Sequence, residues 1–178
     1  LGMVEPGTTY SNVKTGIDHL KELGVTHVQL LPVYDFGSCA DVNDTSCYNW
    51  GYDPVNYSVP EERYSQTPYD YENRIREFKM MVDEFHKAGI RVIMDVVYNH
   101  TYDKSVFSPI TGKYYTATDL SGCSNSIDAT NPMVGRMIQD SLEYWIKEYN
   151  IDGFRFDLVG IFDYAVVDGW AKYLNNKF

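Results

Sequence analysis

Two charged residues lie two positions apart in an otherwise apolar segment, residues 151–160 (IDGFRFDLVG). Side chains alternate along a strand, so Arg155 and Asp157 are predicted to share one face. The arginine would keep the neighbouring carboxylate ionised, and an ionised, oriented carboxylate is what the nucleophile of a glycosidase requires. The alternative role for Asp157 is a helix N-cap, which is common where a strand passes into a helix.

An earlier apolar segment (RVIMDVVYNH) also carries polar residues, and alternation places Asp95 and Asn99 on one of its faces. If the two strands are neighbours, Asp95 can pair with Arg155, because a buried carboxylate without a partner is too costly. Such a pair can equally be architectural. His100 follows this strand and can donate hydrogen bonds to a ligand, but a single histidine there is as readily a structural residue.

Aromatic and hydrogen-bonding residues gather in residues 48–57 (YNWGYDPVNY). The flat faces of aromatic rings stack well on the C–H faces of sugars, so this segment is a candidate sugar platform. The chain has 16 tyrosines, however, and some of them must serve packing alone.

A helix followed at once by a strand recurs three times and must position these residues. Gly24 stands where the first helix should end, and Asn131 with Pro132 marks the start of the third. The helices are predicted at residues 11–24, 73–89 and 131–150, and the strands at 25–33, 90–98 and 152–157. This order predicts an α/β fold with a parallel sheet.

Two long connections, residues 34–72 and 101–130, leave the C-terminal ends of the predicted strands. No Gly-rich phosphate loop follows any strand, which favours a segment of a barrel over a nucleotide-binding fold. In barrels this face carries the active site, so the long connections are expected to be functional.

The formal net charge of −10 disfavours nucleic acid and anionic membrane surfaces as partners. No apolar run reaches the roughly 18 to 20 residues of a membrane span. Cys39, Cys47 and Cys123 are expected to be free thiols, with a bridge between the first two as the alternative. No signal-peptide pattern is present, and we expect an internal piece of a longer protein, so an extracellular or cytoplasmic location stays open.

The motifs DVVYNH (95–100) and DGFRFD (152–157) resemble the first two sequence regions of the α-amylase family, glycoside hydrolase family 13. YNWGYDP (48–54), LLPVYDFGS (30–38) and FDLVGIFD (156–163) are more narrowly similar to the type I pullulanases, the α-1,6-debranching members. The resemblance covers essentially the whole chain.

It implies a (β/α)8 TIM barrel, of which this chain would carry approximately strands two to four with their helices. Residues 1–178 would then be an internal segment of a single catalytic barrel domain, truncated at both ends. The implied partner is an α-glucan, and no cofactor is required, although calcium is possible. The resemblance implies that Asp157 is the nucleophile and that Arg155 holds it in place. His100 would bond the sugar just before the cleaved bond, and Tyr52 would stack beneath that sugar. Asp95 matches the aspartate of the family's third strand, and Asn99 matches a position that binds calcium in many amylases.

The resemblance also implies that the acid/base Glu and a further Asp follow later strands that this chain lacks, so the chain alone is expected to be inactive. Alternatives are an α-1,4 amylase or a glucan-branching transferase of the same family, or a non-catalytic glucan-binding relative. Against the amylase, Asp157 is followed by Leu-Val-Gly rather than an Ala-x-Lys-His type of ending. Val159 stands where pullulanases usually carry Met.

Overall fold

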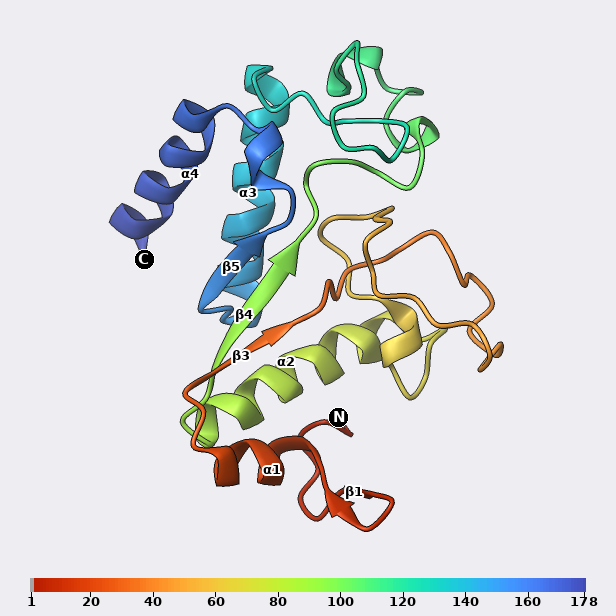
Figure 1. The fold of residues 1–178 in the computed structure, drawn as a ribbon, viewed down its shortest axis with the longest axis vertical. Coiled ribbons are helices and arrows are strands. Elements are labelled where there is room, and N and C mark those ends of the chain that lie inside the picture. The colour runs from red at the N-terminus through yellow and green to blue at the C-terminus, as the bar shows by residue number, and fades with distance from the viewer. Residues whose placement is uncertain (1) are drawn as a thin grey trace.

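Three parallel strands form the centre of the computed structural model, which describes residues 2–178 (Figure 1). They are β3 (His27–Leu30), β4 (Arg91–Val96) and β5 (Gly153–Phe156), hydrogen-bonded in that order. Strands that follow one another in the chain are therefore neighbours in the sheet. The predicted parallel sheet is confirmed, and each strand lies within its predicted range.

A helix precedes each of these strands, as predicted. The α-helices are α1 (Gly16–Leu23), α2 (Tyr71–Lys87), α3 (Pro132–Tyr149) and α4 (Tyr164–Lys177), and the short 3-10 helices are η1 (Glu62–Tyr64), η2 (Lys104–Val106), η3 (Gly112–Tyr114) and η4 (Val159–Ile161).

The first helix begins later than its apolar pattern indicated. Instead of helix, residues near the N-terminus form an antiparallel hairpin of β1 (Thr9–Tyr10) and β2 (Val13–Lys14). Ser11 and Asn12 both take a left-handed conformation, with φ of 50° and 62°, which suits the two-residue turn of a hairpin. The preference of Ser11 and Asn12 for a hairpin turn therefore outweighs the helical spacing of the apolar residues at the start of this segment.

The predicted helix ends are confirmed where a specific residue marks them. Gly24 is left-handed at φ 69°, and its N–H bonds to the carbonyls of Leu20 and Lys21. The side chain of Asn131 accepts a hydrogen bond from the N–H of Met133, with Pro132 in the first turn of α3. These caps satisfy backbone groups that a helix leaves unpaired at its termini.

One face of the sheet packs against α2 and α3. Val92, Met94 and Val96 of β4 are fully buried in an apolar cluster that includes Phe85 of α2 and Trp145 of α3. Because side chains alternate along a strand, the odd-numbered residues of β4 lie on the opposite face of the sheet. That opposite face is where the polar residues of the candidate site meet.

The long connections after β3 and β4 leave the same, C-terminal end of the sheet, as predicted (Figure 1). They are ordered by hydrogen bonds to the rest of the fold. The Tyr57 hydroxyl donates to the carbonyl of His100 at 2.6 Å, and the Trp145 indole donates to the carbonyl of Tyr57 at 2.9 Å. The two connections are thereby tied to each other and to α3.

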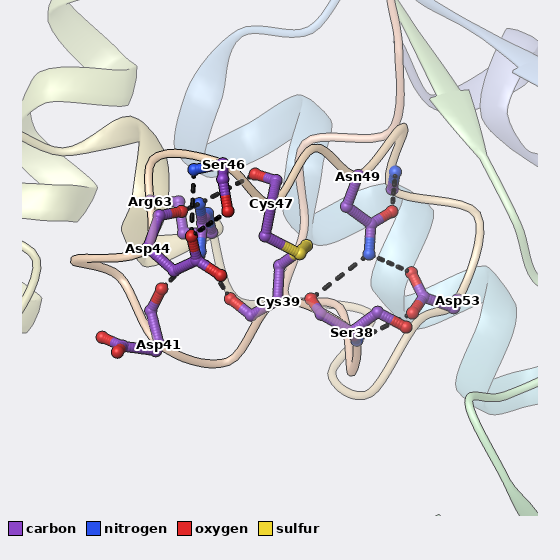
Figure 2. Close-up of a disulfide and its surroundings, with 10 residues drawn as sticks. Ser38, Cys39, Asp41, Asp44, Ser46, Cys47, Asn49, Asp53 and Arg63 are labelled. Carbon is purple, nitrogen blue, oxygen red and sulfur yellow. Dashed lines mark hydrogen bonds between the residues drawn. A yellow bond between two sulfur atoms is a disulfide. The ribbon is translucent and has the colours of Figure 1, made fainter.

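The expectation of free thiols at Cys39 and Cys47 is wrong, because the two form a disulfide (Figure 2). The chain turns back on itself within the first connection and brings their Cα atoms to 5.7 Å, a normal separation for a disulfide. Cys123 is free and exposed, as expected. Within the part of the chain that the structure describes, no helix has the length and apolar character to cross a bilayer.

We expect Gly51→Ala to destabilise the first connection. Gly51 has φ 89°, and a Cβ there would lie 2.6 Å from the carbonyl oxygen of Pro32. Gly122 provides the matched control, since it has φ 78° but no atom within 4 Å of its Cβ position. In urea denaturation, the free energy of unfolding should fall by about 2 kcal/mol more in Gly51→Ala than in Gly122→Ala. Equal losses would contradict the steric argument.

Candidate active site

The register of β4 and β5 places Asp95 directly beside Arg155. The arginine Nη1 lies 3.0 Å from both oxygens of Asp95 and 3.0 Å from Oδ1 of Asp157. One guanidinium nitrogen therefore bridges two carboxylates, which confirms the predicted pairing across the strands and along β5. The Asp95 hydrogen bond, followed by the charges of both carboxylates, raises the pKa of Arg155 and keeps it cationic.

Asp157 follows β5 and is not a helix cap, so the capping alternative is wrong. Its N–H donates to the carbonyl of Val96, which continues the ladder between the strands by one residue. Leu158 then takes a left-handed conformation at φ 46° and turns the chain away, and the N-cap of α4 is Asp163. The Asp157 side chain is left 18% exposed at the end of the sheet, open to a ligand.

Asn99, which lies in the turn after β4, holds Asp157. Its Nδ2 donates to the backbone carbonyl of Asp157 at 2.9 Å and to Oδ2 of the same residue at 3.2 Å. The carboxylate of Asp157 thus has one oxygen on Arg155 and the other on Asn99. Alternation predicts that Asn99 shares a face with Asp95. The contact between Asn99 and Asp157 has no such signal in the sequence.

Calcium at Asn99, which the resemblance allows but does not require, stays untested. The Asn99 amide oxygen is bonded to Nδ1 of His100. Elsewhere in residues 2–178, the carboxylate oxygens of Asp35, Glu61 and Glu62 lie within 4.8 Å of one another, close enough to share a metal ion.

His100 is buried between Asn99 and the first connection. Its Nε2 lies 2.8 Å from the carbonyl oxygen of Tyr52, and its Nδ1 is bonded to Asn99. Burial lowers the pKa of His100 below its usual value. Each ring nitrogen lies against a protein oxygen, and a neutral imidazole donates a hydrogen bond to one of the two. The expected bond to a sugar stays a prediction.

Tyr52 completes the network from the first connection. Its hydroxyl donates to Oδ2 of Asp95 at 2.7 Å. Burial and then this hydrogen bond raise the pKa of Tyr52 to about 12, so the phenol remains a neutral donor. The six residues predicted for the site thus form one connected set, made of Asp157, Arg155, Asp95, Asn99, His100 and Tyr52.

The two carboxylates of this set differ in their access to a ligand. The Asp95 side chain is only 2% exposed, and its oxygens accept hydrogen bonds from Arg155 and Tyr52. Asp157 remains partly open. Among the residues that the structure describes, the hydrogen-bonded site therefore offers one accessible carboxylate, suited to act as an oriented nucleophile or as a ligand for hydroxyl groups.

Two further tyrosines, Tyr34 and Tyr57, support the backbone near the site, and no sequence pattern indicates this role. The Tyr34 hydroxyl accepts a hydrogen bond from the N–H of Val97, where β4 ends. Tyr57 holds the carbonyl of His100, as described above. Both contacts are to backbone groups, and no spacing of residue types in the sequence indicates such contacts.

Comparison with known proteins identifies the group to which this arrangement belongs. The family described as "Alpha amylase, catalytic domain" matches residues 9–109, more than half of the chain. The chain belongs to the alpha-amylase family. The fold of this family is a TIM barrel, and the three parallel strands with their helices are part of one.

Within the alpha-amylase family the chain is similar to proteins named pullulanase and isoamylase. It is 40% identical to a pullulanase of Bacillus subtilis over 94% of its own length and 25% of the relative's. It is 40% identical to isoamylase SU1 of Zea mays, over 88% of the chain and 22% of that relative. The chain thus spans about a quarter of these relatives.

The solved structures to which the chain is similar include pullulanases as well. A crystal structure of a pullulanase from Paenibacillus barengoltzii in complex with maltohexaose and alpha-cyclodextrin superimposes with a TM-score of 0.93. The match has 41% sequence identity and covers 99% of this chain and 29% of the other.

Removing Arg155, the cation of the site, should destabilise the fold more than removing a cation from the surface. Arg155→Met leaves the buried Asp95 without its charged partner, and we expect the free energy of unfolding to fall by about 3 kcal/mol. Arg136→Met is the matched control, because Arg136 pairs with Asp140 on the exposed face of α3, and its removal should lower the free energy of unfolding far less. Similar losses in urea denaturation would show that the bridge does not stabilise the fold.

Proposed function

We propose that the protein containing this chain is a retaining glycoside hydrolase that cleaves α-1,6 branch linkages in pullulan, glycogen or starch dextrins. The observation that carries the proposal is the carboxylate of Asp157, partly exposed at the end of β5 and held on both oxygens by Arg155 and Asn99. A fixed, accessible carboxylate is what the first step of a retaining mechanism uses.

In this proposal Asp157 attacks the anomeric carbon, and the bond to the leaving oxygen breaks as a covalent glycosyl-enzyme forms. Water then releases the sugar. Arg155 and Asn99 restrict the rotation of the carboxylate, so the attacking oxygen is oriented before substrate arrives. The step also needs a general acid about 5 to 5.5 Å from the nucleophile. We propose that residues outside this chain supply it, since Asp95 is enclosed by donors.

The other site residues have supporting roles in the proposal. Tyr52 stacks beneath the sugar before the cleaved bond. His100 bonds that sugar through Nε2, which exchanges its contact with the Tyr52 carbonyl for one with a sugar hydroxyl. Asp95 keeps Arg155 and the Tyr52 hydroxyl in place. Acid–base and nucleophilic chemistry of this kind uses no metal ion, so calcium, if bound, would serve the structure alone.

The chain is proposed to supply strands two to four of the barrel, as an internal segment of one catalytic domain. The order β3-β4-β5 with a helix before each strand supports this placement. The proposed partner is an α-glucan, and the negative net charge supports the absence of nucleic acid and anionic membrane partners.

The type of bond rests on the names of the relatives, which are pullulanases and isoamylases. Release of maltotriose from pullulan by the full-length protein would support α-1,6 cleavage. Products of α-1,4 cleavage or of chain transfer would point instead to an amylase or a branching enzyme.

Asp157→Asn in the full-length protein tests the nucleophile. We expect turnover of pullulan to fall about a thousand-fold or more, because an amide cannot form the glycosyl-enzyme, while glucan binding remains. Asp163→Asn is the matched control, since Asn caps a helix as well as Asp and Asp163 only caps α4. Retained turnover in Asp157→Asn would show the assignment to be wrong.

The proposal also predicts that the 178-residue chain is inactive by itself. Without a general acid the leaving oxygen is not protonated, so purified chain should release no reducing sugar from pullulan, whereas the full-length protein does. Hydrolysis by the isolated chain would require an acid within it and would contradict the proposed division of roles.

A further inference from the structure

One peptide unit beside the site is held by side chains from both long connections. It joins His100 to Thr101, shortly after β4. The His100 carbonyl accepts a hydrogen bond from the Tyr57 hydroxyl at 2.6 Å. The Thr101 N–H donates to Oδ1 of Asn125 at 2.9 Å. Tyr57 belongs to the first connection and Asn125 to the second, so the plane of this peptide is fixed from two sides. We call Tyr57 and Asn125 the clamp.

The backbone groups next to this peptide are paired as well. Nδ2 of Asn125 donates to the carbonyl of Thr101 at 2.7 Å, so one amide side chain bonds both backbone groups of Thr101. The carbonyl of Asn99 accepts a hydrogen bond from the N–H of Ile127 at 2.9 Å. Rotation of the backbone between Asn99 and Thr101 would therefore break several hydrogen bonds at once.

Both side chains of the clamp are enclosed by the fold. Tyr57 is 6% exposed and Asn125 is 2% exposed. The carbonyl of Tyr57 accepts hydrogen bonds from the Trp145 indole at 2.9 Å and from the Ser141 hydroxyl at 3.3 Å, and its ring packs edge-on against Tyr34. A buried polar group that loses its partner finds no water to replace it, so the bonds of the clamp are costly to break.

The clamp bears on His100, because the His100 side chain leaves the backbone at the Cα atom where the clamped peptide begins. Its Nδ1 is bonded to Asn99, and its Nε2 lies 2.8 Å from the carbonyl oxygen of Tyr52. When Nε2 exchanges that carbonyl for a sugar hydroxyl, the ring loses one of its own two anchors. The bonds to the backbone are unaffected by this exchange and keep the base of the ring in place.

We propose that Tyr57 and Asn125 are positioning residues, which fix the peptide after His100 and thereby aim its imidazole at the sugar. Neither residue contacts the sugar in this proposal. The inference rests on the proposed function, because it requires His100 to bond the sugar before the cleaved bond. It gives the second connection a part in the reaction, although that connection supplies none of the six site residues. Small misplacements of a substrate-binding group lower turnover strongly.

Tyr57→Phe in the full-length protein removes the hydroxyl of the clamp and keeps the ring. We expect kcat/KM for pullulan to fall about three- to ten-fold, the effect of one lost hydrogen bond. Tyr98→Phe is the matched control, because Tyr98 is fully buried and its ring centroid lies 5.0 Å from that of Tyr57, but its hydroxyl bonds to Ser141. Equal losses of kcat/KM in the two variants would overturn the proposal.

Asn125→Ala tests the other half of the clamp. We expect kcat/KM for pullulan to fall about ten-fold or more, because this change removes the bonds to both backbone groups of Thr101. Asn73→Ala is the matched control, since Asn73 is also buried and its Nδ2 also makes two hydrogen bonds, to Thr67 and Glu77, but it lies in α2. A loss in Asn73→Ala as large as that in Asn125→Ala would contradict the proposal.

The His100→Ala background shows whether the clamp acts through His100. In a protein that already lacks the imidazole, Tyr57→Phe and Asn125→Ala should leave kcat/KM unchanged, although each still lowers the urea midpoint of unfolding. A purely architectural role would lower kcat/KM by the same factor with and without His100, and that result would refute the proposal.

A binding measurement separates this proposal from the proposed function. Where the unaltered protein cleaves pullulan, the comparison in the His100→Ala background decides the role of the clamp. Absence of turnover would refute the proposed function, and the affinity for maltotriose, measured by calorimetry, would then decide. An affinity about three-fold weaker in Tyr57→Phe but not in Tyr98→Phe would support the clamp, and equal affinity in the two variants would refute it.

Discussion

A single guanidinium nitrogen between two carboxylates organises the polar face of this sheet. Asp95 lies in the middle of an apolar strand and is almost fully buried, so its charge is tolerable only with a cation and further donors beside it. Arg155 supplies the cation from β5, and the Tyr52 hydroxyl, in the connection after β3, supplies a further donor. The same nitrogen also holds Asp157, so a contact required for stability orients the group proposed to react.

The long connections obey a related constraint, because each buried or folded-back backbone group must find a partner. Side chains meet much of this demand. Trp145 and Tyr57 link α3, the first connection and the carbonyl of His100, while Arg63 gathers the carbonyls of the disulfide loop. Loops held in this way present side chains in fixed positions, which lowers the entropy lost on binding a ligand.

Sequence patterns predicted the repeated helix and strand units well, since apolar periodicity and capping residues act over a few neighbouring positions. They failed where a competing local preference intervened, as in the hairpin at Ser11 and Asn12. They also failed for Cys39 and Cys47, because whether two cysteines meet depends on the path of an irregular loop. Asn99 was placed on the correct face, yet its contact with Asp157 depends on the exact ends of two strands.

The sequence by itself determined the parallel α/β architecture and the strands that carry Asp95 and Arg155, whereas their meeting on one face depended on the two strands being neighbours. Apolar periodicity and alternation act over neighbouring positions, so the architecture and the strands follow from local sequence. Only the tertiary structure decided that Asp157 is open while Asp95 is enclosed, that each His100 nitrogen lies against a protein oxygen, and that Asn99 contacts Asp157. Exposure and hydrogen-bond partners are set by segments distant in the chain, and no local pattern encodes them.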